Sequence, residues 1–410
     1  MSEQTLSVVI PNFNHADCLA AAVESCYLHG RPADEVVVVD DGSTDDSMHV
    51  LERLAREYPS LRIIRHERNR GAASALNTGV HAARCQWVLL RAVDDLFPGG
   101  SIDAFRRIAE QFPESGLITG DVVYFQRDPS RGVREHMGRS RIPVAITAQS
   151  FVERFGNNLI HGAASFCRKR WITEAGGLDE ALRWHCDWHL FTRIGLNRGF
   201  VYAPEVFGCM RLNAESYNAK GTSIENLQSA VLERLIEKLE ASSEELSRIL
   251  ASGSLDFFGE PLLCILRKQG KAQSDVWGTL FREQPDAVRQ ARLETGLGAV
   301  MNGFLSRNRE LLRAHAGRVA IFGAGGHTRW LMECWRERGI PAAVMILDSG
   351  GGEVSGELMG VPVCRLEAVS KLAGALVVLS SKSYEPALAS LMEQRAPGVR
   401  YLRIWGADDR

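Results

Sequence analysis

The sequence predicts an α/β protein in three parts: a parallel sheet covered by helices, a helical middle segment, and a second, small sheet. Two observations predict the first part. Short runs of Val, Ile and Leu alternate with helical stretches from Leu6 to about Val122, which is the pattern of parallel α/β sheets. The run 35–39 then passes directly into Asp40 and Asp41. Two carboxylates therefore stand at the carboxyl end of a buried strand, where open α/β sheets bind their ligands.

Hydrophobic periodicity gives the elements of this first part. We expect strands at 6–10, 35–39 and 61–65, and a fourth that starts at Trp87 and leads to two further acids. Pro11 is expected to break the first strand. Helices are expected at 16–28, 46–57, 72–84 and 101–111.

Two further domains are predicted after the first, which we place at residues 1–222. Residues 223–316 show Leu-rich helical periodicity and no strand-like run, which predicts a helical segment for packing, tethering or oligomerisation. Strands return at Arg318. The order strand, glycine-rich turn, helix and strand predicts a small Rossmann-like domain over residues 317–410.

The glycine-rich turn of that last domain is a candidate phosphate- or nucleotide-binding element. Gly323 and Gly325 occupy the first two positions of a dinucleotide fingerprint, and Asp348 ends the next strand. Amides at the start of the intervening helix could hold a phosphate. Because Thr328 replaces the third glycine and Asp348 lies farther along than usual, we do not expect NAD as a cofactor.

Bulk composition excludes several classes of protein. The 410 residues are 45% hydrophobic and carry a net charge of −2, which is typical of globular proteins and gives no support for nucleic-acid binding. No apolar run approaches the roughly 20 residues that span a bilayer, and we expect no signal peptide, because the first strand follows the N-terminus directly. Nine cysteines without a C-x-x-C pair indicate reduced thiols. We expect a cytoplasmic protein without a transmembrane segment, either free or peripheral to the inner face of the membrane.

Polar residues also follow the other strands of the first part. They are Pro11 and Asn14 after the first strand, Asn69, Gly71 and Asn77 after the third, and Asp94 and Asp95 after the fourth. Alone, each motif also fits a strand followed by a capped helix or a solvated acidic turn. Their order and spacing favour one site at the carboxyl edge of the sheet.

The ordered set resembles the nucleotide-sugar half of a family 2 glycosyltransferase, with the GT-A fold, from about Leu6 to about Ser216. The resemblance implies that Asp40 contacts the base. It implies that Asp94 and Asp95 bind the ribose and a cation, Mg²⁺ or Mn²⁺, that neutralises the departing diphosphate. The remaining donor-site residues that it implies are Pro11, Asn14, Asp41, Asn69, Gly71, Asn77 and Arg211.

The acceptor half carries the segment Gly176-Gly-Leu-Asp-Glu180, followed by Asp187 at the start of a predicted helix. By the same resemblance, Asp187 is the general base that takes the proton from the acceptor hydroxyl. Attack from the face opposite the leaving group then inverts the anomeric centre. An acid favoured by the helix dipole is the alternative interpretation of Asp187.

Three positions depart from the family pattern. Ala92 stands where the acidic motif has its first acid, Cys186 replaces the Glu before the base, and Asn213 stands where His is common. The loss of two common ligands predicts a weakened metal site. It leaves open a metal-poor site, a site that uses Arg91 or the Arg-rich loop 126–143 instead, or a loss of catalysis.

The sequence therefore predicts an inverting glycosyltransferase that moves a sugar from a UDP-linked or other nucleotide-diphospho-sugar donor. The expected acceptor is a glycan, a lipid-linked glycan or another hydroxyl compound in surface polysaccharide synthesis. Further expected partners are a second copy of the chain or other glycan-assembly proteins. Two alternatives remain: a degenerate transferase that binds a nucleotide-sugar or a partner, and a sugar-modifying oxidoreductase centred on the C-terminal domain.

Overall fold

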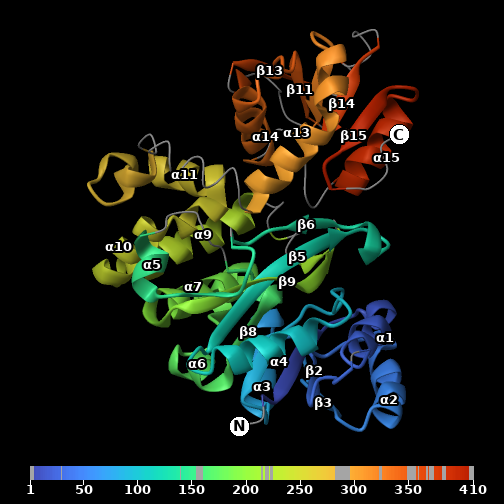
Figure 1. The fold of residues 1–410 in the computed structure, drawn as a ribbon, viewed down its shortest axis with the longest axis vertical. Helices are drawn as coiled ribbons and strands as arrows, with labels where there is room; N and C mark the ends of the chain where they lie inside the picture. The colour runs from blue at the N-terminus through green and yellow to red at the C-terminus, as the bar shows by residue number, and fades with distance from the viewer. Residues whose placement is uncertain are drawn as a thin grey trace. The chain divides into compact units, whose positions relative to one another are not determined.

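The computed structural model forms two compact units (Figure 1). The first comprises residues 1–123, 136–211 and 221–284, and the second comprises residues 124–135, 212–220 and 285–410. The structure describes residues 4–28, 30–138, 140–153, 160–213, 216–217, 221, 225–281, 296–322, 326–348, 357–358, 360–365, 368, 374–380 and 385–405. Within these ranges, no helix combines the length and the apolar character that a membrane crossing requires.

A mixed sheet forms the core of the first unit. Its strand order is β3-β2-β1-β4-β8-β5-β9-β7. Strands β1 to β4 are mutually parallel, whereas β8 runs antiparallel to β4 and β5, and β7 runs antiparallel to β9. The bounds are β1 Leu6–Asn12, β2 Glu35–Asp40, β3 Leu61–Arg65, β4 Trp87–Leu90, β5 Leu117–Phe125, β7 Val144–Ile146, β8 Ser165–Arg168 and β9 Phe200–Arg211.

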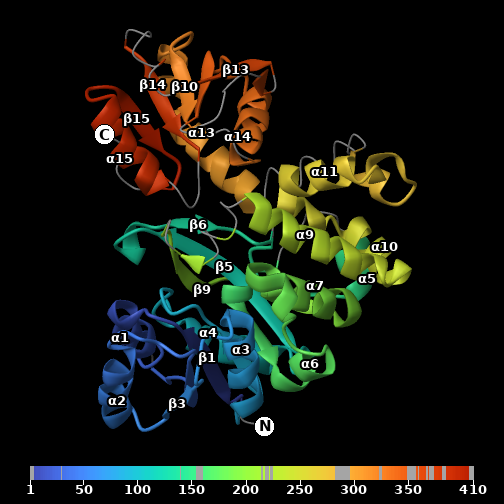
Figure 2. The same ribbon diagram turned by 180° about the vertical axis from the view of Figure 1, so that it is seen from behind.

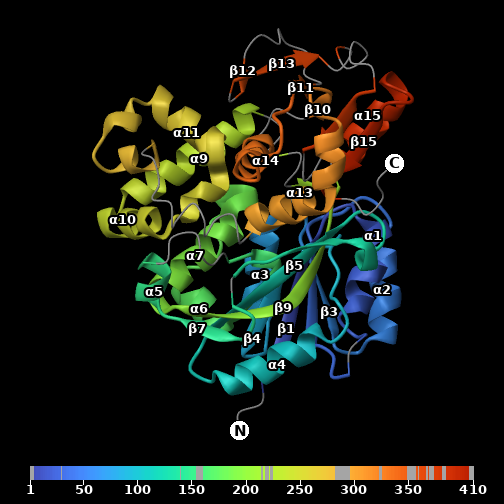
Figure 3. The same ribbon diagram turned by 45° about the horizontal axis from the view of Figure 1, so that its top comes forward.

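The four expected helices of the parallel half are present, with ends within three residues of those predicted. They are α1 Ala16–Ser25, α2 Ser47–Glu57, α3 Ala72–Ala82 and α4 Ser101–Gln111. Right-handed crossovers place α1 and α2 on one face of the sheet and α3 on the other, because the chain reverses direction across the sheet after β3 (Figure 3). The reversal makes the gap between β1 and β4 a topological switch point, where such sheets bind ligands.

Pro11 lies inside β1 and does not break it, so that expectation was wrong. β1 stays paired with β2 through Asn12, with Pro11 opposite Val39. The Arg91 N–H donates to the Val9 carbonyl, and backbone groups two residues apart in a strand face the same neighbour. The missing N–H of Pro11 therefore faces the side of β4, whose pairing with β1 has already ended at Val9. No ladder hydrogen bond is lost.

Helices complete the first unit. α9 packs onto α10 and onto η3, and α10 packs onto α7, where Arg193 Nε lies 3.0 Å from Glu245 Oε1 in α10. The remaining elements are α5 Ala148–Glu153, η2 Gly162–Ala164, α6 Lys169–Glu174, η3 Glu180–His185, α7 Cys186–Arg198, α9 Glu225–Glu240, α10 Ser243–Ser252, η4 Ser254–Phe258, α11 Gly259–Lys268, η5 Lys271–Gln273 and η6 Trp277–Phe281. The elements from 225 to 281 are all helical, as predicted, but they belong to the first unit in space. The domain boundaries at 222 and 316 stay a prediction.

The second unit contains a second, largely parallel sheet (Figure 2). Its order is β12-β13-β11-β10-β14-β15, and only the β12–β13 pair is antiparallel. Its core includes Phe322, Leu347, Leu379 and Met392. The elements are η1 Pro129–Arg131, β6 Val133–Glu135, α13 Gly296–Ala314, β10 Val319–Phe322, α14 Gly326–Glu337, β11 Met345–Asp348, β12 Glu357–Leu358, β13 Val361–Arg365, β14 Leu376–Leu379, α15 Glu385–Arg395 and β15 Arg400–Arg403.

The chain order strand, turn, helix and strand agrees with the parallel α/β domain expected after Arg318. β10 and α14 flank the glycine-rich turn, but Gly323 and Gly325 themselves lie outside the described residues. Asp348 is the last residue of β11. A phosphate- or nucleotide-binding role for these three residues stays a prediction.

Gly79 shows how closely α3 approaches the sheet. A Cβ at Gly79 would lie 2.2 Å from Val9 Cγ1 and 3.3 Å from Val39 Cγ2. Alanine is the better helix former by about 1 kcal/mol, but overpacking of a core typically costs about 1–3 kcal/mol. We expect Gly79→Ala to lower the free energy of unfolding by roughly 1–2 kcal/mol, measured by urea denaturation.

Gly303→Ala in α13 is the matched control. A Cβ there would meet only the end of the flexible Arg307 side chain, at 3.3 Å, so helix propensity should decide the outcome and stability should not fall. A Gly79→Ala protein as stable as the wild type would contradict the close packing of α3 on β1.

Candidate functional site

Asp40 is buried beneath the loops at the carboxyl edge of the first sheet. It is 0% exposed. Its Oδ2 accepts a hydrogen bond from Asn12 Nδ2 at 2.9 Å, and its Oδ1 accepts one from the Ser43 N–H at 3.1 Å. Arg65 Nε lies 3.9 Å from Oδ1. Asp40 therefore joins the ends of β1 and β2 to the turn that follows β2.

Asp41 holds the loop that follows β3. Its oxygens accept hydrogen bonds from the N–H groups of Arg70 at 3.0 Å and Gly71 at 2.7 Å, and one lies 2.7 Å from His66 Nδ1. Asn69 Oδ1 accepts a second bond from the Gly71 N–H, at 2.9 Å. Gly71 has φ 96°, and a Cβ there would meet nothing within 4 Å. Open space therefore adjoins the backbone at Gly71, as a close approach of a ligand would require.

The two asparagines at the edge of the site have different surroundings. Asn14 Oδ1 accepts hydrogen bonds from the Thr44 N–H at 2.8 Å and the Asp45 N–H at 3.3 Å, so Asn14 fixes the exposed rim. The amide of Asn77 is paired with both backbone groups of Leu178, at 2.8 and 2.9 Å. Asn77 therefore anchors the segment that precedes η3 and α7, and its amide is already engaged.

The acidic turn after β4 is tied to the end of β9. Leu96 and Cys209 exchange two backbone hydrogen bonds of 2.9 Å, and the Arg211 N–H donates to Asp95 Oδ1 at 3.1 Å. Asp95 Oδ2 is buried and has no hydrogen-bond partner among the residues that the structure describes. Leaving a buried polar atom unpaired is costly. The orphaned oxygen therefore fits a ligand supplied from outside the chain, such as a cation.

Arg91 is a buried cation beside this turn. It is 1% exposed, and its guanidinium donates to the carbonyl oxygens of Phe207 at 2.9 Å and Leu96 at 3.3 Å. The guanidinium carbon also lies 4.1 Å from the centre of the Phe97 ring. Arg91 is an internal counter-charge for the acidic turn, not an exposed substitute for a metal ion.

Burial raises the pKa of both carboxyl groups of the turn. Electrostatic interactions with His15 and Arg211 oppose this rise in the pKa of Asp94. At Asp95, repulsion from Asp94 adds to burial, and the charge of Arg91 opposes them. The pair therefore resists carrying two negative charges, and a bound cation would relieve the repulsion.

Asp187 lies in the first turn of α7, as expected. Its Oδ1 accepts a hydrogen bond from the Trp188 N–H at 2.8 Å. Burial raises the pKa of Asp187, which makes its carboxylate a stronger base. A Cβ on Gly162 would lie 2.0 Å from Asp187 Oδ2, so the site requires glycine there. Sequence analysis missed Gly162, because nothing in its spacing marks it.

Contacts through η2 connect Asp187 to the acidic turn. A Cβ on Gly208 in β9 would lie 2.8 Å from the Ala163 carbonyl oxygen and 2.9 Å from an Arg91 guanidinium nitrogen. Ala163 adjoins the glycine that faces Asp187, and Arg91 adjoins the acidic turn. The structure thus links Asp187 to the acidic turn after β4 through η2 and β9.

Helix α9 anchors the turn before Asp187. Gln228 Oε1 accepts a hydrogen bond from Trp184 Nε1 at 2.8 Å and lies 3.2 Å from His185 Nε2. The His185 ring packs edge-on against Phe258, with ring centroids 4.9 Å apart. Burial lowers the pKa of His185 to about 4. This histidine is therefore a neutral packing residue at neutral pH.

This geometry defines a class of protein: an open α/β sheet with carboxylates beside its switch point, where nucleotides and other ligands bind, and a further acid on a separate helix. A family model described as Glycosyl transferase family 2 matches residues 7–175. Residues 7–175 are thus similar to that family, and the resemblance inferred from the motifs is confirmed.

Curated relatives match shorter stretches of the chain. The uncharacterized glycosyltransferase YibD of Escherichia coli K12 is 35% identical over 98 residues, which cover 24% of this chain and 28% of the relative. Glycosyltransferase GlyG of Streptococcus pneumoniae is 29% identical over 133 residues, or 32% and 42% of the two chains. The chain thus spans less than half the length of these relatives.

Among solved structures, residues 1–349 of TarS from S. aureus align with 17% identity and a TM-score of 0.47, over 75% of this chain and 87% of that one. The mannosyltransferase PcManGT from Pyrobaculum calidifontis, in complex with GDP-Man and Mn²⁺, aligns with 19% identity and a TM-score of 0.43, over 73% and 87%.

The neutral state of His185 predicts a pH dependence of stability. Its pKa is about 4 in the folded protein and about 6.5 in the unfolded chain. The unfolded state therefore binds more protons between these values, and stability falls as the pH falls through this window. Relative to His185→Gln, the wild type should lose about 2 kcal/mol of unfolding free energy between pH 7 and pH 4.5, measured by urea denaturation at both pH values.

The comparison with His185→Gln is needed because carboxyl groups elsewhere also titrate in this range. Parallel loss of stability in the two proteins would show that folding does not lower the pKa of His185, and would contradict its burial as a neutral residue.

Proposed function

We propose that the first unit is an inverting glycosyltransferase that uses a UDP-linked sugar donor. The observation that carries the proposal is the acidic turn at the switch point of a family 2 sheet, where Asp95 Oδ2 is buried and unpaired. Open space at Gly71 and the exposed rim at Asn14 adjoin the ends of β3 and β1. A nucleotide would lie along these strand ends.

Asp94 and Asp95 would hold the divalent cation of this site. When bound, Mg²⁺ or Mn²⁺ supplies positive charge that neutralises the oxygens of the departing diphosphate. The raised pKa values of both carboxyl groups and the orphaned oxygen of Asp95 fit such an ion. Ala92 lacks an oxygen ligand at the first position of the motif. We therefore propose a weaker dependence on Mg²⁺ or Mn²⁺ than a complete acidic motif would give.

Asp187 would act as the general base. Its carboxylate takes the proton from the acceptor hydroxyl while the hydroxyl oxygen bonds to the anomeric carbon and the bond to the diphosphate breaks. Burial raises the pKa of Asp187 toward the working pH, which is the direction that improves a general base. Attack opposite the leaving group gives inversion.

The acceptor proposed is the hydroxyl of a glycan or a lipid-linked glycan in surface polysaccharide synthesis. Support comes from relatives with named roles: one curated match, 29% identical over 124 residues, is a PGL/p-HBAD biosynthesis glycosyltransferase of Mycobacterium tuberculosis. We propose that the second unit has an accessory role in binding or docking.

A second candidate function is binding of a nucleotide-sugar without turnover. The observation that favours it is the pair of departures Ala92 and Cys186. Cys186 is 5% exposed, and burial raises its pKa well above the ordinary value, so it supplies no charge beside Asp187. Transfer of sugar with release of the nucleoside diphosphate separates the two functions.

The donor proposal predicts that Asp40→Asn abolishes UDP binding. The substitution keeps the volume of the side chain but removes the charge that orders Asn12 and the Ser43 turn. UDP should raise the thermal midpoint of the wild type, since a ligand of the folded state stabilises it by mass action. We expect almost no UDP-dependent shift in the variant.

Asp46→Asn is the control for this measurement, because Asp46 is an exposed acid at the start of α2 without a capping hydrogen bond. It should keep the wild-type shift. Equal shifts in the wild type and in Asp40→Asn would remove Asp40 from the donor site.

The base assignment predicts that Asp187→Asn lowers the rate of transfer by about two to four orders of magnitude, which is the usual contribution of a positioned base. UDP-dependent thermal shifts should stay unchanged. Gly162→Ala should also lower kcat, because its methyl group would displace Asp187 Oδ2. Steady-state assays of sugar transfer give both values, and Cys186→Ala is the control expected to retain activity. Full activity in Asp187→Asn would refute the assignment.

A further inference from the structure

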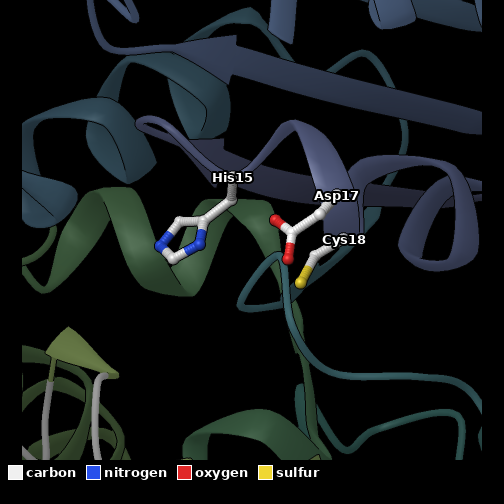
Figure 4. Close-up of side chains that lie close together, drawn as sticks. All are labelled: His15, Asp17 and Cys18. Carbon is white, nitrogen blue, oxygen red and sulfur yellow. The ribbon is translucent and has the colours of Figure 1, made fainter. Parts of the chain in front are cut away.

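Three metal-ligating side chains lie together where β1 meets α1. They are His15, Asp17 and Cys18, whose ligand atoms all lie within 4.8 Å of one another. Figure 4 shows the Asp17 carboxylate between the His15 imidazole and the Cys18 thiol. All three come from a single turn of the chain, so folding of α1 is enough to assemble them.

The His15 ring is not used elsewhere. His15 is the N-cap residue of α1, but its side chain makes no capping hydrogen bond. Its ring nitrogens have no hydrogen-bond partner among the residues described, and its carbonyl alone closes the first turn, accepting from Cys18 and Leu19. An imidazole held at this position without a structural bond is available as a ligand.

The cluster borders the acidic turn across the switch point. Burial and the charges of Asp17 and Asp94 raise the pKa of Cys18 to about 11, so a bound metal ion would have to displace the thiol proton. His15 and Asp17 also act electrostatically on the carboxyl group of Asp94. Topology gives the reason: β1 and β4 are adjacent parallel strands, so the residues after them meet at one edge. Asp94 adjoins Asp95, whose unpaired oxygen is an independent sign that this edge receives a ligand.

The donor atoms select the kind of ion. One imidazole nitrogen, one thiolate sulfur and one carboxylate oxygen suit Zn²⁺ or Co²⁺, whereas Mg²⁺ and Ca²⁺ prefer oxygen alone. Ligands held about 2.0–2.3 Å from one zinc ion lie less than about 4 Å apart, so shifts of about an ångström would complete the shell. Three protein ligands leave a fourth position for water or an external group. The helix N-terminus disfavours a cation, but the charge of Asp17 in the first turn offsets this effect.

We propose that His15, Asp17 and Cys18 form a binding site for a zinc-class transition metal ion, with its open position on the side of Asp94. The site is separate from the oxygen-only cation site proposed at Asp94 and Asp95. It does not rest on the proposed function, because the metal ion alone is the ligand.

Titration of the metal-depleted full-length protein with Co²⁺ tests the site. A thiolate ligand gives a charge-transfer absorption band, and tetrahedral coordination gives intense visible bands, both of which Zn²⁺ should displace. Cys18→Ser should remove the charge-transfer band. His15→Gln and Asp17→Asn should each weaken Co²⁺ binding by more than about 100-fold, because loss of an outer-shell partner alone costs 10–100-fold.

Two controls keep the result specific. Cys264→Ser removes an exposed thiol outside the cluster and should leave the spectrum unchanged. Circular dichroism and thermal melting of each variant show that loss of binding is not loss of folding. A charge-transfer band that survives Cys18→Ser, or no Co²⁺ binding by the wild type, would overturn the inference. It would also be overturned if Asp94→Asn alone abolished binding while the three cluster variants retained it.

Discussion

The hydrogen bonds accepted by two buried carboxylates determine the shape of the edge on which the rest of the site depends. A buried charge is tolerated only when donors surround it. Asp40 and Asp41 accept hydrogen bonds from the end of β1 and from two loops, through Asn12, Ser43 and the backbone from Arg70 to Gly71. These two carboxylates therefore have a structural role, because their hydrogen bonds join the ends of the strands to the loops that follow them. Their position beneath the loops also means that any ligand meets mainly what they hold in place.

The acidic turn after β4 is organised by a different balance. Arg91 supplies positive charge from within the core, and Arg211 also opposes the negative charges of Asp94 and Asp95. Burial nevertheless raises the pKa of both carboxyl groups, and repulsion from Asp94 adds to the shift at Asp95. A bound cation would relieve this repulsion, so the charge of the turn is coupled to occupancy of the edge.

Much of this fold could be predicted from local patterns. The continuous Val run of β2 and the acids after it predicted a buried parallel strand, and the buried positions of β2 confirm it. Pro11 was misjudged because its effect depends on which neighbour its nitrogen faces, and that is set by the register with β4. Gly162 and the His15 cluster were invisible to sequence reasoning for a related reason. Their possible roles depend on the residues that lie next to them in the folded chain. Their spacing along the sequence matches no motif of the family.

Gln228 and Glu245 connect the helical segment after residue 222 to α7 and to the turn before it. Gln228 accepts a hydrogen bond from the indole N–H of Trp184, just before α7. Glu245 forms an ion pair with Arg193 in α7. The segment thus supports α7 and the turn before it within the first unit. Under the proposed function, a change in these helices would alter the acceptor side even where every residue of the strand-end site is preserved. Acceptor preference could then change while the donor site stays the same.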